Sequence, residues 1–339
     1  MSIRMKVAQA VLLSLYAVGC LTQPVAAYDG AMTLIIENDT FTGSDDNYTN
    51  GVGFSWASDD LDTYGRESFL NKWGRFWAFL PFVKDDGYTT YASWSLVQEI
   101  YTPDEITDPD PPGDDQPYAG VLYLDNLLYA RKGRWGHVWA LKLGVVGPDS
   151  RAEDVQKGFH DLIGANEPLG WHNQHPNEPV INLGYTAACL AAEGSAAGLA
   201  EWKIVPVGTL GLGTYFTGAG LGIYGEIGWN LVDAFGGAAL RTGFNAASTV
   251  GIGPVDNLSV AFFGSLGGFA VAHYLPLDGT VFTDSRSVDT EPFVGMASCG
   301  FSVRQGRFAL SFSTSFFTET FETERNNAEF GTVSLSWYY

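Results

Sequence analysis

The sequence predicts an all-β protein, a transmembrane antiparallel β-barrel of about twelve strands with a short helix in an outer loop. Three observations support this fold class: many segments alternate apolar and small polar residues, glycine and aromatic residues are abundant, and charged residues are few. Alternation with a period of two lets one face of a strand meet lipid while the other faces the lumen. Charged residues make up 17% of the chain, compared with roughly 25% in typical soluble domains.

The N-terminus has the pattern of a secretory signal peptide. A positively charged start is followed by an apolar run from Ala8 to Leu21 and by small residues ending at Ala27. The run is too short to cross a bilayer as a helix. We therefore expect residues 1–27 to be cleaved, and residues 28–339 to form one barrel domain in a bacterial outer membrane. Lipoprotein processing at Cys20 is the weaker alternative.

Thirteen segments show the alternation that predicts strands. Bacterial single-chain barrels close with an even number of strands, so we expect twelve, with one segment outside the barrel or two merged. The segments are 31–39, 48–58, 88–100, 117–130, 135–147, 180–192, 202–214, 219–231, 237–250, 257–273, 292–304, 307–322 and 329–339.

The last segment ends the chain on Trp-Tyr-Tyr. A final amphipathic strand with a terminal aromatic residue is similar to the assembly signal of outer-membrane barrels. The barrel assembly machinery is therefore an expected partner during biogenesis.

Loop lengths predict which end of the barrel faces outward. If the first strand runs outward, segments 40–47, 101–116 and 148–179 are outer loops, while 131–134 is a short inner turn. Long outer loops and short inner turns are typical of these barrels. Segment 59–87 is the exception on the inner side. Its Phe, Trp, Lys and Arg residues indicate a helix at the membrane interface, or alternatively a plug or core helix.

Charge and cysteine content restrict the partners. The formal net charge of −20 argues against nucleic acid, because the phosphate backbone would repel the protein. It is compatible with a cell-surface protein that recruits divalent cations. Cys189 and Cys299 share the parity of apolar neighbours, so we expect lipid-facing thiols, more readily free than paired.

Several polar residues should converge at the outer end of neighbouring strands. Asn38 and Asp39 end the first strand, Thr49 begins the second, Glu99 lies near the end of the third, and His160 lies in the loop after the fifth. Polar groups that meet from separate rigid elements are how active sites are built.

His160 lies in a predicted helix. Ser150 and Glu153 form a capping box, and Gly164 is the expected stop. Gln156 and His160 are four residues apart and therefore lie side by side, next to an apolar stripe of Val155, Phe159 and Leu162. A neutral imidazole is a suitable general base near neutral pH. His172 and His175 lie in the same loop and stay open as alternatives.

The oxygen-bearing side chains suit calcium. Asp39 and Glu99 are hard donors with the parity of lumen-facing positions, and Asn38 and Thr49 add neutral oxygens. The acidic loop 101–116 more readily forms a solvated surface than a metal site. The sequence contains neither a Gly-x-Ser-x-Gly motif nor a histidine followed two residues later by serine, so we expect attack by water on a metal-polarised ester.

Three motifs together resemble the lipid A deacylase family LpxR. Glu37–Gly51 (ENDTFTGSDDNYTNG) is similar to the opening signature of the family, and Gln98–Pro103 to its third-strand motif. Gly144–Asp149, followed by the helix from Val155 to Ala165, resembles its helical motif. Their order is kept across residues 37–171, while the later strands match in kind.

The resemblance implies calcium-dependent removal of the 3′-linked acyloxyacyl group of lipid A at the outer leaflet. It implies His160 as the base, Asn38 and Asp39 at Ca²⁺, and Thr49 and Gln156 as orienting residues. Glu99 is a further carboxylate for the metal. The family's glutamate six residues after the histidine is replaced here by Asn166. Lipopolysaccharide and outer-membrane lipids are the expected partners. The rival functions are an outer-membrane phospholipase and a non-enzymatic porin or structural barrel.

Overall fold

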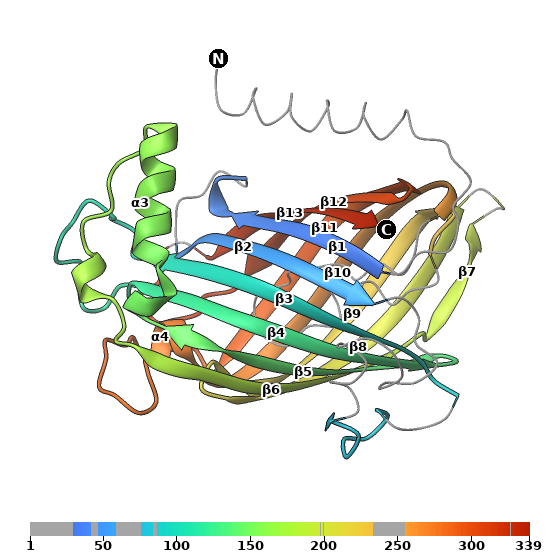
Figure 1. Ribbon diagram of the computed structural model, residues 1–339, viewed down its shortest axis with the longest axis horizontal. Helices are drawn as coiled ribbons and strands as arrows, with labels where there is room; N and C mark the ends of the chain where they lie inside the picture. Colours follow the sequence, from blue (N-terminus) through green and yellow to red (C-terminus); the bar gives the residue numbers. More distant parts are fainter. Residues whose placement is uncertain are drawn as a thin grey trace.

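The structure is a computed structural model that describes residues 30–41, 47–58, 76–83, 87–196, 198, 200–232, 255–325 and 327–339. It is a barrel of long tilted antiparallel strands (Figure 1). The strands are β1 Gly30–Asn38, β2 Asn47–Ser58, β3 Thr89–Thr102, β4 Ala119–Lys132, β5 Trp135–Val146, β6 Glu178–Cys189, β7 Ala192–Ala196, β8 Ala200–Gly213, β9 Phe216–Trp229, β10 Val255–Tyr274, β11 Phe293–Gly306, β12 Phe308–Phe317 and β13 Glu329–Tyr338. The helices are η1 Asp39–Phe41, η2 Pro148–Ser150, α3 Ala152–Ile163, η3 Trp171–Asn173 and α4 Leu275–Asp278.

Twelve of these strands close the barrel. Each pairs antiparallel with its neighbour, and the β6–β8 and β1–β13 pairings complete the ring. The short strand β7 pairs with β8 and lies outside the ring. The predicted twelve-stranded antiparallel barrel is therefore confirmed.

Twelve of the thirteen alternating segments overlap the ring strands. The remaining segment, 237–250, lies outside the described residues, and the ring closes without it because β9 pairs directly with β10. Alternation predicted the strands well because each has one face in lipid and one in the lumen. The expected signal peptide, residues 1–27, also lies outside the described residues.

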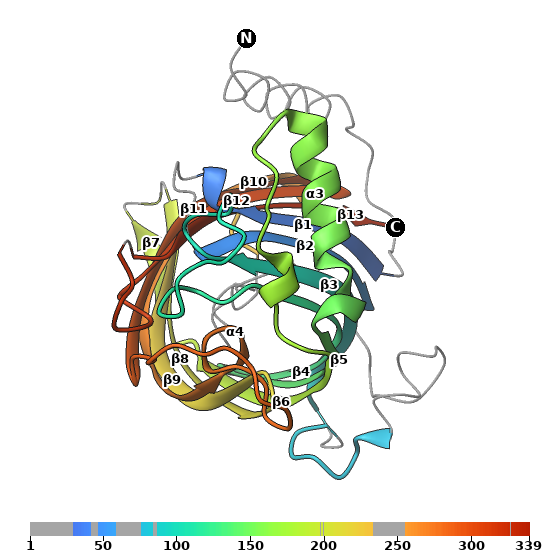
Figure 2. The same ribbon diagram turned by 90° about the vertical axis from the view of Figure 1, so that its left-hand side faces the viewer.

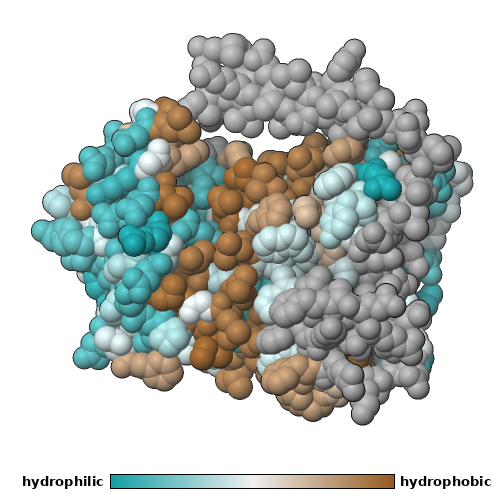
Figure 3. Space-filling view, viewed as in Figure 1, coloured by the Kyte–Doolittle hydropathy of each residue, from teal (hydrophilic) through white to brown (hydrophobic). Residues whose placement is uncertain are grey.

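The outer wall is apolar. Figure 3 shows a broad apolar belt across the strands, bounded by polar surface at the α3 end. At the opposite end, Trp135, Trp229 and Trp337 lie exposed, as in the aromatic girdles of membrane barrels. Both Cys189 and Cys299 are free, as expected. No helix among the described residues is long and apolar enough to span a membrane. Exposed residues of the belt include Leu34, Val52, Phe54, Leu96, Leu124, Leu143, Ile181, Leu210, Leu221, Leu266 and Leu335.

The lumen is filled at the α3 end. Inward-facing side chains from strands all around the ring pack into one buried cluster, and Leu275 and Leu277 of α4 join it. Protein interiors of this kind leave few voids larger than a water molecule. The strand residues of the cluster are Tyr48, Val97, Tyr101, Ala119, Val121, Tyr123, Val146, Val180, Phe216, Tyr274, Val294, Phe317 and Phe330.

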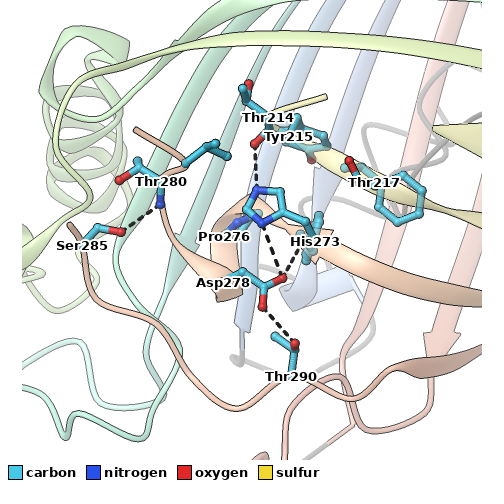
Figure 4. A network of polar contacts seen from close by, with 12 residues as sticks. Thr214, Tyr215, Thr217, His273, Pro276, Asp278, Thr280, Ser285 and Thr290 are labelled. Carbon is cyan, nitrogen blue, oxygen red and sulfur yellow. Dashed lines mark hydrogen bonds and ion pairs between the residues drawn. The ribbon is translucent and has the colours of Figure 1, made fainter. Parts of the chain in front are cut away.

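Polar contacts fasten α4 into the barrel mouth (Figure 4). Asp278 accepts hydrogen bonds from the Tyr274 backbone N–H (2.6 Å) and from the Thr290 hydroxyl (2.9 Å). His273 Nδ1 lies 3.9 Å from Asp278, while its Nε2 contacts the Thr214 carbonyl oxygen at 3.0 Å. These contacts join α4 to the end of β10 and to the segment between β8 and β9.

The described part of segment 59–87 packs on the outside of the barrel. Residues 76–83 lie against the outer wall at the end opposite α3 (Figures 1 and 2). Val83 packs with Leu128, and Trp139 donates to the Pro81 carbonyl at 2.9 Å. Phe79 is 72% exposed. This stretch therefore fits the interfacial alternative better than the plug, while the predicted helix falls largely on residues 59–75 and 84–86, outside the described residues.

Candidate active site

Helix α3 crosses the barrel end at which β1 finishes and β2 begins. Figures 1 and 2 both show it running perpendicular to the barrel axis, past the ends of β1–β4. Its start packs on β4, where a Cβ added to Gly120 would lie 2.2 Å from Ala152 Cβ and 2.4 Å from Ser150 Oγ. The Gln98 amide on β3 donates to the Ser150 carbonyl at 2.6 Å. A glycine and a glutamine on the outer face therefore seat the helix directly on the wall.

Different local interactions determine where α3 begins and where it ends. The predicted capping box is wrong: the N-cap is Arg151, with φ 59° and no side-chain cap hydrogen bond. Ser150 is instead fully buried beneath the helix. Its carbonyl oxygen accepts from the Gln98 amide, and its hydroxyl oxygen accepts weakly from the Ala152 N–H. The predicted stop is confirmed, since Gly164 adopts the left-handed conformation (φ 72°) and its N–H binds the His160 carbonyl.

Gln156 is held in one orientation. It is buried, and the Trp171 indole N–H donates to Gln156 Oε1 at 2.7 Å. An indole N–H can only donate, so the amide oxygen must face Trp171 and the amide NH₂ must face the other way. Gln156 Nε2 is buried and has no hydrogen-bond partner within the part of the chain that the structure describes. Trp171 itself is fixed by Tyr118, with ring centroids 4.9 Å apart.

His160 has a defined tautomer. Its Nδ1 lies 2.5 Å from the Asn166 carbonyl oxygen. Because a carbonyl only accepts, Nδ1 carries the proton and Nε2 of the neutral ring is left as the proton acceptor. The contact comes from the backbone of residue 166 and is therefore compatible with asparagine at this position. Glu167 is engaged elsewhere, 3.6 Å from Lys157 Nζ.

The length of α3 brings His160 toward β1. Eight residues separate it from Ala152, which corresponds to about 12 Å of helix rise. Ala152 lies over β4, and three strand spacings amount to about 14 Å. His160 is thus carried from the β4 side toward the ends of β1 and β2. Figure 2 shows α3 running across these strand ends.

Asn38 and Thr49 are joined at these strand ends. Asn38 Nδ2 donates to the Thr49 carbonyl at 2.6 Å. Thr49 lies at an irregularity in the β2–β3 register, between Tyr48 and Asn50. The Thr49 hydroxyl is 2.6 Å from that of Thr102 at the end of β3. The bulge directs Thr49 away from the lumen, although Tyr48 beside it points inward.

Asp39 follows immediately in η1 and is only 1% exposed. Its carboxylate and the Asn38 amide oxygen are hard donors of the kind that Ca²⁺ prefers. Since Asn38 Nδ2 is used by Thr49, Oδ1 is the atom of this amide suited to a cation. The described residues contain no group of three His, Cys, Asp or Glu side chains arranged for a metal. Backbone, water or substrate oxygens would have to complete a calcium shell here.

Glu99 lies on the other side of the wall, in the lumen. Its Oε1 accepts from the Tyr123 hydroxyl at 2.5 Å, and its Oε2 accepts from Tyr215 at 2.7 Å and Tyr101 at 3.1 Å. Lys142 Nζ lies 3.6 Å from the Tyr215 ring centroid. The parity of Glu99 along its strand correctly predicted that the side chain faces the lumen. Its oxygens are enclosed by phenol hydroxyls, and the structure does not bring it together with Asn38 and Thr49 on the outer face.

The two other histidines of the loop differ from His160. His172 is largely exposed, 3.5 Å from Asp110. His175 is fully buried, with Nε2 3.3 Å from the Pro276 carbonyl, and burial lowers the pKa of His175 to about 4. Neither lies on α3, so neither shares the helix face of Gln156.

The acidic loop 101–116 is a folded surface. Asp115 accepts the N–H groups of Asp104 (3.2 Å) and Gln116 (2.7 Å), while partial burial raises the pKa of Asp115. Arg286 donates to the Pro111 and Pro112 carbonyls and ties this loop to the segment after α4. Its carboxylates therefore serve the loop's own structure and its solvated face.

Sequence reasoning missed Trp171 and the backbone of Asn166. Each acts on a predicted site residue through a contact formed by loop closure after α3. The available sequence signal for such a contact is a tryptophan in a polar loop, because a buried indole N–H needs a hydrogen-bond acceptor.

A family model and one solved structure agree with this fold. The family model described as outer membrane protein LpxR matches residues 7–339. LpxR from Salmonella typhimurium superposes with a TM-score of 0.72 at 18% identity, covering 91% of this chain and all of that one. The β domain of the Bordetella autotransporter BrkA gives 0.44 at 11% identity, with coverages of 92% and 100%. The AIDA-I transport unit from Escherichia coli gives 0.38 at 8%, with coverages of 92% and 90%. No curated protein matches the sequence.

Proposed function

Since the chain belongs to the LpxR family of outer-membrane proteins, we propose that it is a calcium-dependent lipid A 3′-O-deacylase whose site faces the cell surface. The observation that carries this proposal is the setting of His160. It lies on α3 with Nδ1 held by the Asn166 carbonyl, so that Nε2 is the acceptor when the ring is neutral. It is carried toward the barrel end where Asn38 ends β1 and Asp39 begins η1.

His160 is the general base of the proposed reaction. Nε2 takes a proton from water, and the water oxygen attacks the carbonyl carbon of the 3′ ester. The imidazolium then returns the proton to the departing sugar oxygen, which releases the acyloxyacyl acid and leaves a hydroxyl on lipid A. The Asn166 carbonyl favours this sequence because it keeps the Nδ1 proton in place and stabilises the positive ring.

Asn38 and Asp39 are the proposed calcium ligands. When bound, the cation would polarise the ester carbonyl. Thr49 fixes Asn38 through the 2.6 Å contact between the Asn38 amide and the Thr49 carbonyl, so that the amide oxygen is directed elsewhere. Glu99, first expected as a further ligand, is better assigned to the support of the barrel end because three tyrosine hydroxyls already donate to it.

Gln156 is proposed to orient the substrate. Trp171 holds its oxygen, so the NH₂ group is the part that can donate to a substrate oxygen. A buried donor prepared in this way stabilises developing negative charge better than a mobile one.

The filled lumen weighs against the porin alternative. Buried side chains from strands around the ring occupy the α3 end of the lumen, whereas a pore requires a water-filled path. The phospholipase alternative is weakened because no histidine is followed two residues later by serine, the pairing that is typical of the calcium-dependent outer-membrane phospholipase family.

The test is mass spectrometry of lipid A from cells expressing the wild type or His160→Gln, with calcium or with chelator. We expect lipid A to lose the mass of one acyloxyacyl group only in cells that express the wild type in the presence of calcium. His172→Gln is the matched control and should remain active. Unchanged lipid A with a folded wild-type barrel, or release of lysophospholipid instead, would rule out the proposed reaction.

A further inference from the structure

The apolar stripe of α3 does not pack against the protein. Val155, Phe159, Leu162 and Ile163 are exposed by 43%, 46%, 81% and 43%. The buried residues of the helix are instead Ala152 and Gln156. An exposed amphipathic helix in a soluble protein normally turns its apolar face to the core, so this stripe needs another apolar surface.

The other side of the helix is charged. With about 100° per residue, Lys157 and Asp161 lie on the side roughly opposite Val155, Phe159 and Leu162. Lys157 pairs there with Glu153 at 3.0 Å. The helix therefore has one side suited to water and one suited to hydrocarbon, with the barrel contact between them.

Helix α3 lies at one end of the lipid-facing wall. Both views of the ribbon show the helix perpendicular to the barrel axis, and its C-terminal end extends beyond the barrel wall (Figures 1 and 2). Exposed Leu34, Val52 and Leu96 cover the wall of β1–β3 below it. Leu162, the most exposed residue of the stripe, belongs to the overhanging end.

We propose that α3 lies in the membrane interface, with the stripe Val155–Phe159–Leu162–Ile163 inserted among the acyl chains of the leaflet at this end of the barrel. Lipid is the fitting partner because the stripe continues the lipid-facing belt of the wall, and because the opposite side of the helix carries charge, as in interfacial helices. The inference is independent of the proposed reaction. It assigns α3 a second role, which is to hold His160 and Gln156 at the depth of the lipid headgroups.

Site-directed spin labelling tests this placement. Nitroxides are attached to F159C or D161C, two residues about 160° apart around the helix, in a background with C189S and C299S. Each barrel is reconstituted in phospholipid vesicles, and its folding is verified by heat-modifiable electrophoretic mobility. The collision rates with oxygen, which partitions into lipid, and with a water-soluble nickel complex are then measured.

We expect a several-fold higher oxygen-to-nickel ratio at position 159 than at position 161. Equal nickel access at the two positions would overturn the proposal. Shielding of position 159 from both reagents, with spin–spin coupling between copies, would also overturn it, because a second chain would then cover the stripe. Should F159C fail to fold, L162C and K157C, about 140° apart around the helix, form a second pair with the same expected difference.

Discussion

Two groups of polar side chains share the α3 end of the barrel but lie on opposite faces of its wall. On the outer face, Asn38, Thr49 and Thr102 are linked by short contacts and lie at strand ends that α3 crosses. In the lumen, Glu99 is surrounded by tyrosines, and Glu37 accepts from Tyr48 at 2.5 Å. Glu37 and Glu99 occupy the same register level, each paired with Gly51 of β2.

The difference shows that similar residue types serve different tasks on the two faces. The lumen carboxylates accept hydrogen bonds from tyrosine hydroxyls and, at Glu37, also from the Thr332 hydroxyl, an arrangement that stabilises a closed barrel end. The outer group lies at strand ends that α3 crosses, and this helix carries a histidine and a glutamine with oriented polar atoms. Substitutions on the two faces should therefore separate activity from stability.

The largest expected effect is on activity, at the end of β1. Asp39→Asn should lower deacylation about 1000-fold, equivalent to about 4 kcal/mol of transition-state stabilisation, because the amide removes the negative charge proposed to hold calcium. The unfolding midpoint of the barrel should change little. Deacylation is measured on lipid A in vesicles over a calcium titration, and activity that stays independent of calcium in both proteins would contradict the assignment.

In the lumen, a substitution should lower stability more than activity. Glu99→Leu leaves three tyrosine hydroxyls without their acceptor, so the free energy of unfolding should fall by on the order of 3 to 4 kcal/mol. Reversible urea unfolding in vesicles measures this loss. At low temperature, where the variant stays folded, its activity should lie within about tenfold of wild type. A 1000-fold loss there, with normal stability, would return Glu99 to the calcium site.

Acid should weaken the mouth of the barrel through His175. The pKa of His175 is lowered by burial to about 4, against about 6.5 in an unfolded chain. The unfolded state therefore binds the extra proton between these values, and the stability from the neutral ring, present above pH 6.5, is lost as pH falls toward 4. The upper limit is about 3 kcal/mol.

The comparison is wild type against His175→Gln, whose amide can still donate to the Pro276 carbonyl. The wild-type advantage in unfolding free energy should shrink from pH 7.5 to pH 5. Arg286 and Glu178 also contribute to the surroundings of this histidine and remain unchanged in both proteins. An advantage that is constant with pH would contradict the buried neutral ring.

The smallest expected effect is on activity. It distinguishes the packing of α3 against the barrel wall from the stability of the helix itself. Gly120→Ala would place a methyl group 2.2 Å from Ala152 Cβ, so α3 must shift on the wall, and activity should fall about tenfold, or about 1.4 kcal/mol. Gly158→Ala is the matched control, because nothing lies within 4 Å of the added methyl and alanine favours the helix. Equal activity of the two variants would mean that α3 need not be seated closely.

Much of the fold was predictable because its causes are local. Each ring strand alternates along its own length, so the predicted segments match the observed strands, and parity correctly predicted that Glu99 faces the lumen. Gly164 ends α3 through its own φ angle. The strand count was harder, because 237–250 has the alternation of a strand and β9–β10 pairing alone shows that the ring closes without it.

The sequence by itself determined the periodicity, the lipid-facing belt and the Gln156–His160 spacing, since these depend on residues within one strand or one helical turn. Tertiary structure decided the rest. The start of α3 at Ala152 depends on its seat on Gly120, the orientation of Gln156 depends on Trp171, and the tautomer of His160 depends on the Asn166 carbonyl. These contacts join segments that meet only when the barrel closes and its loops pack, so no local pattern of residues encodes them.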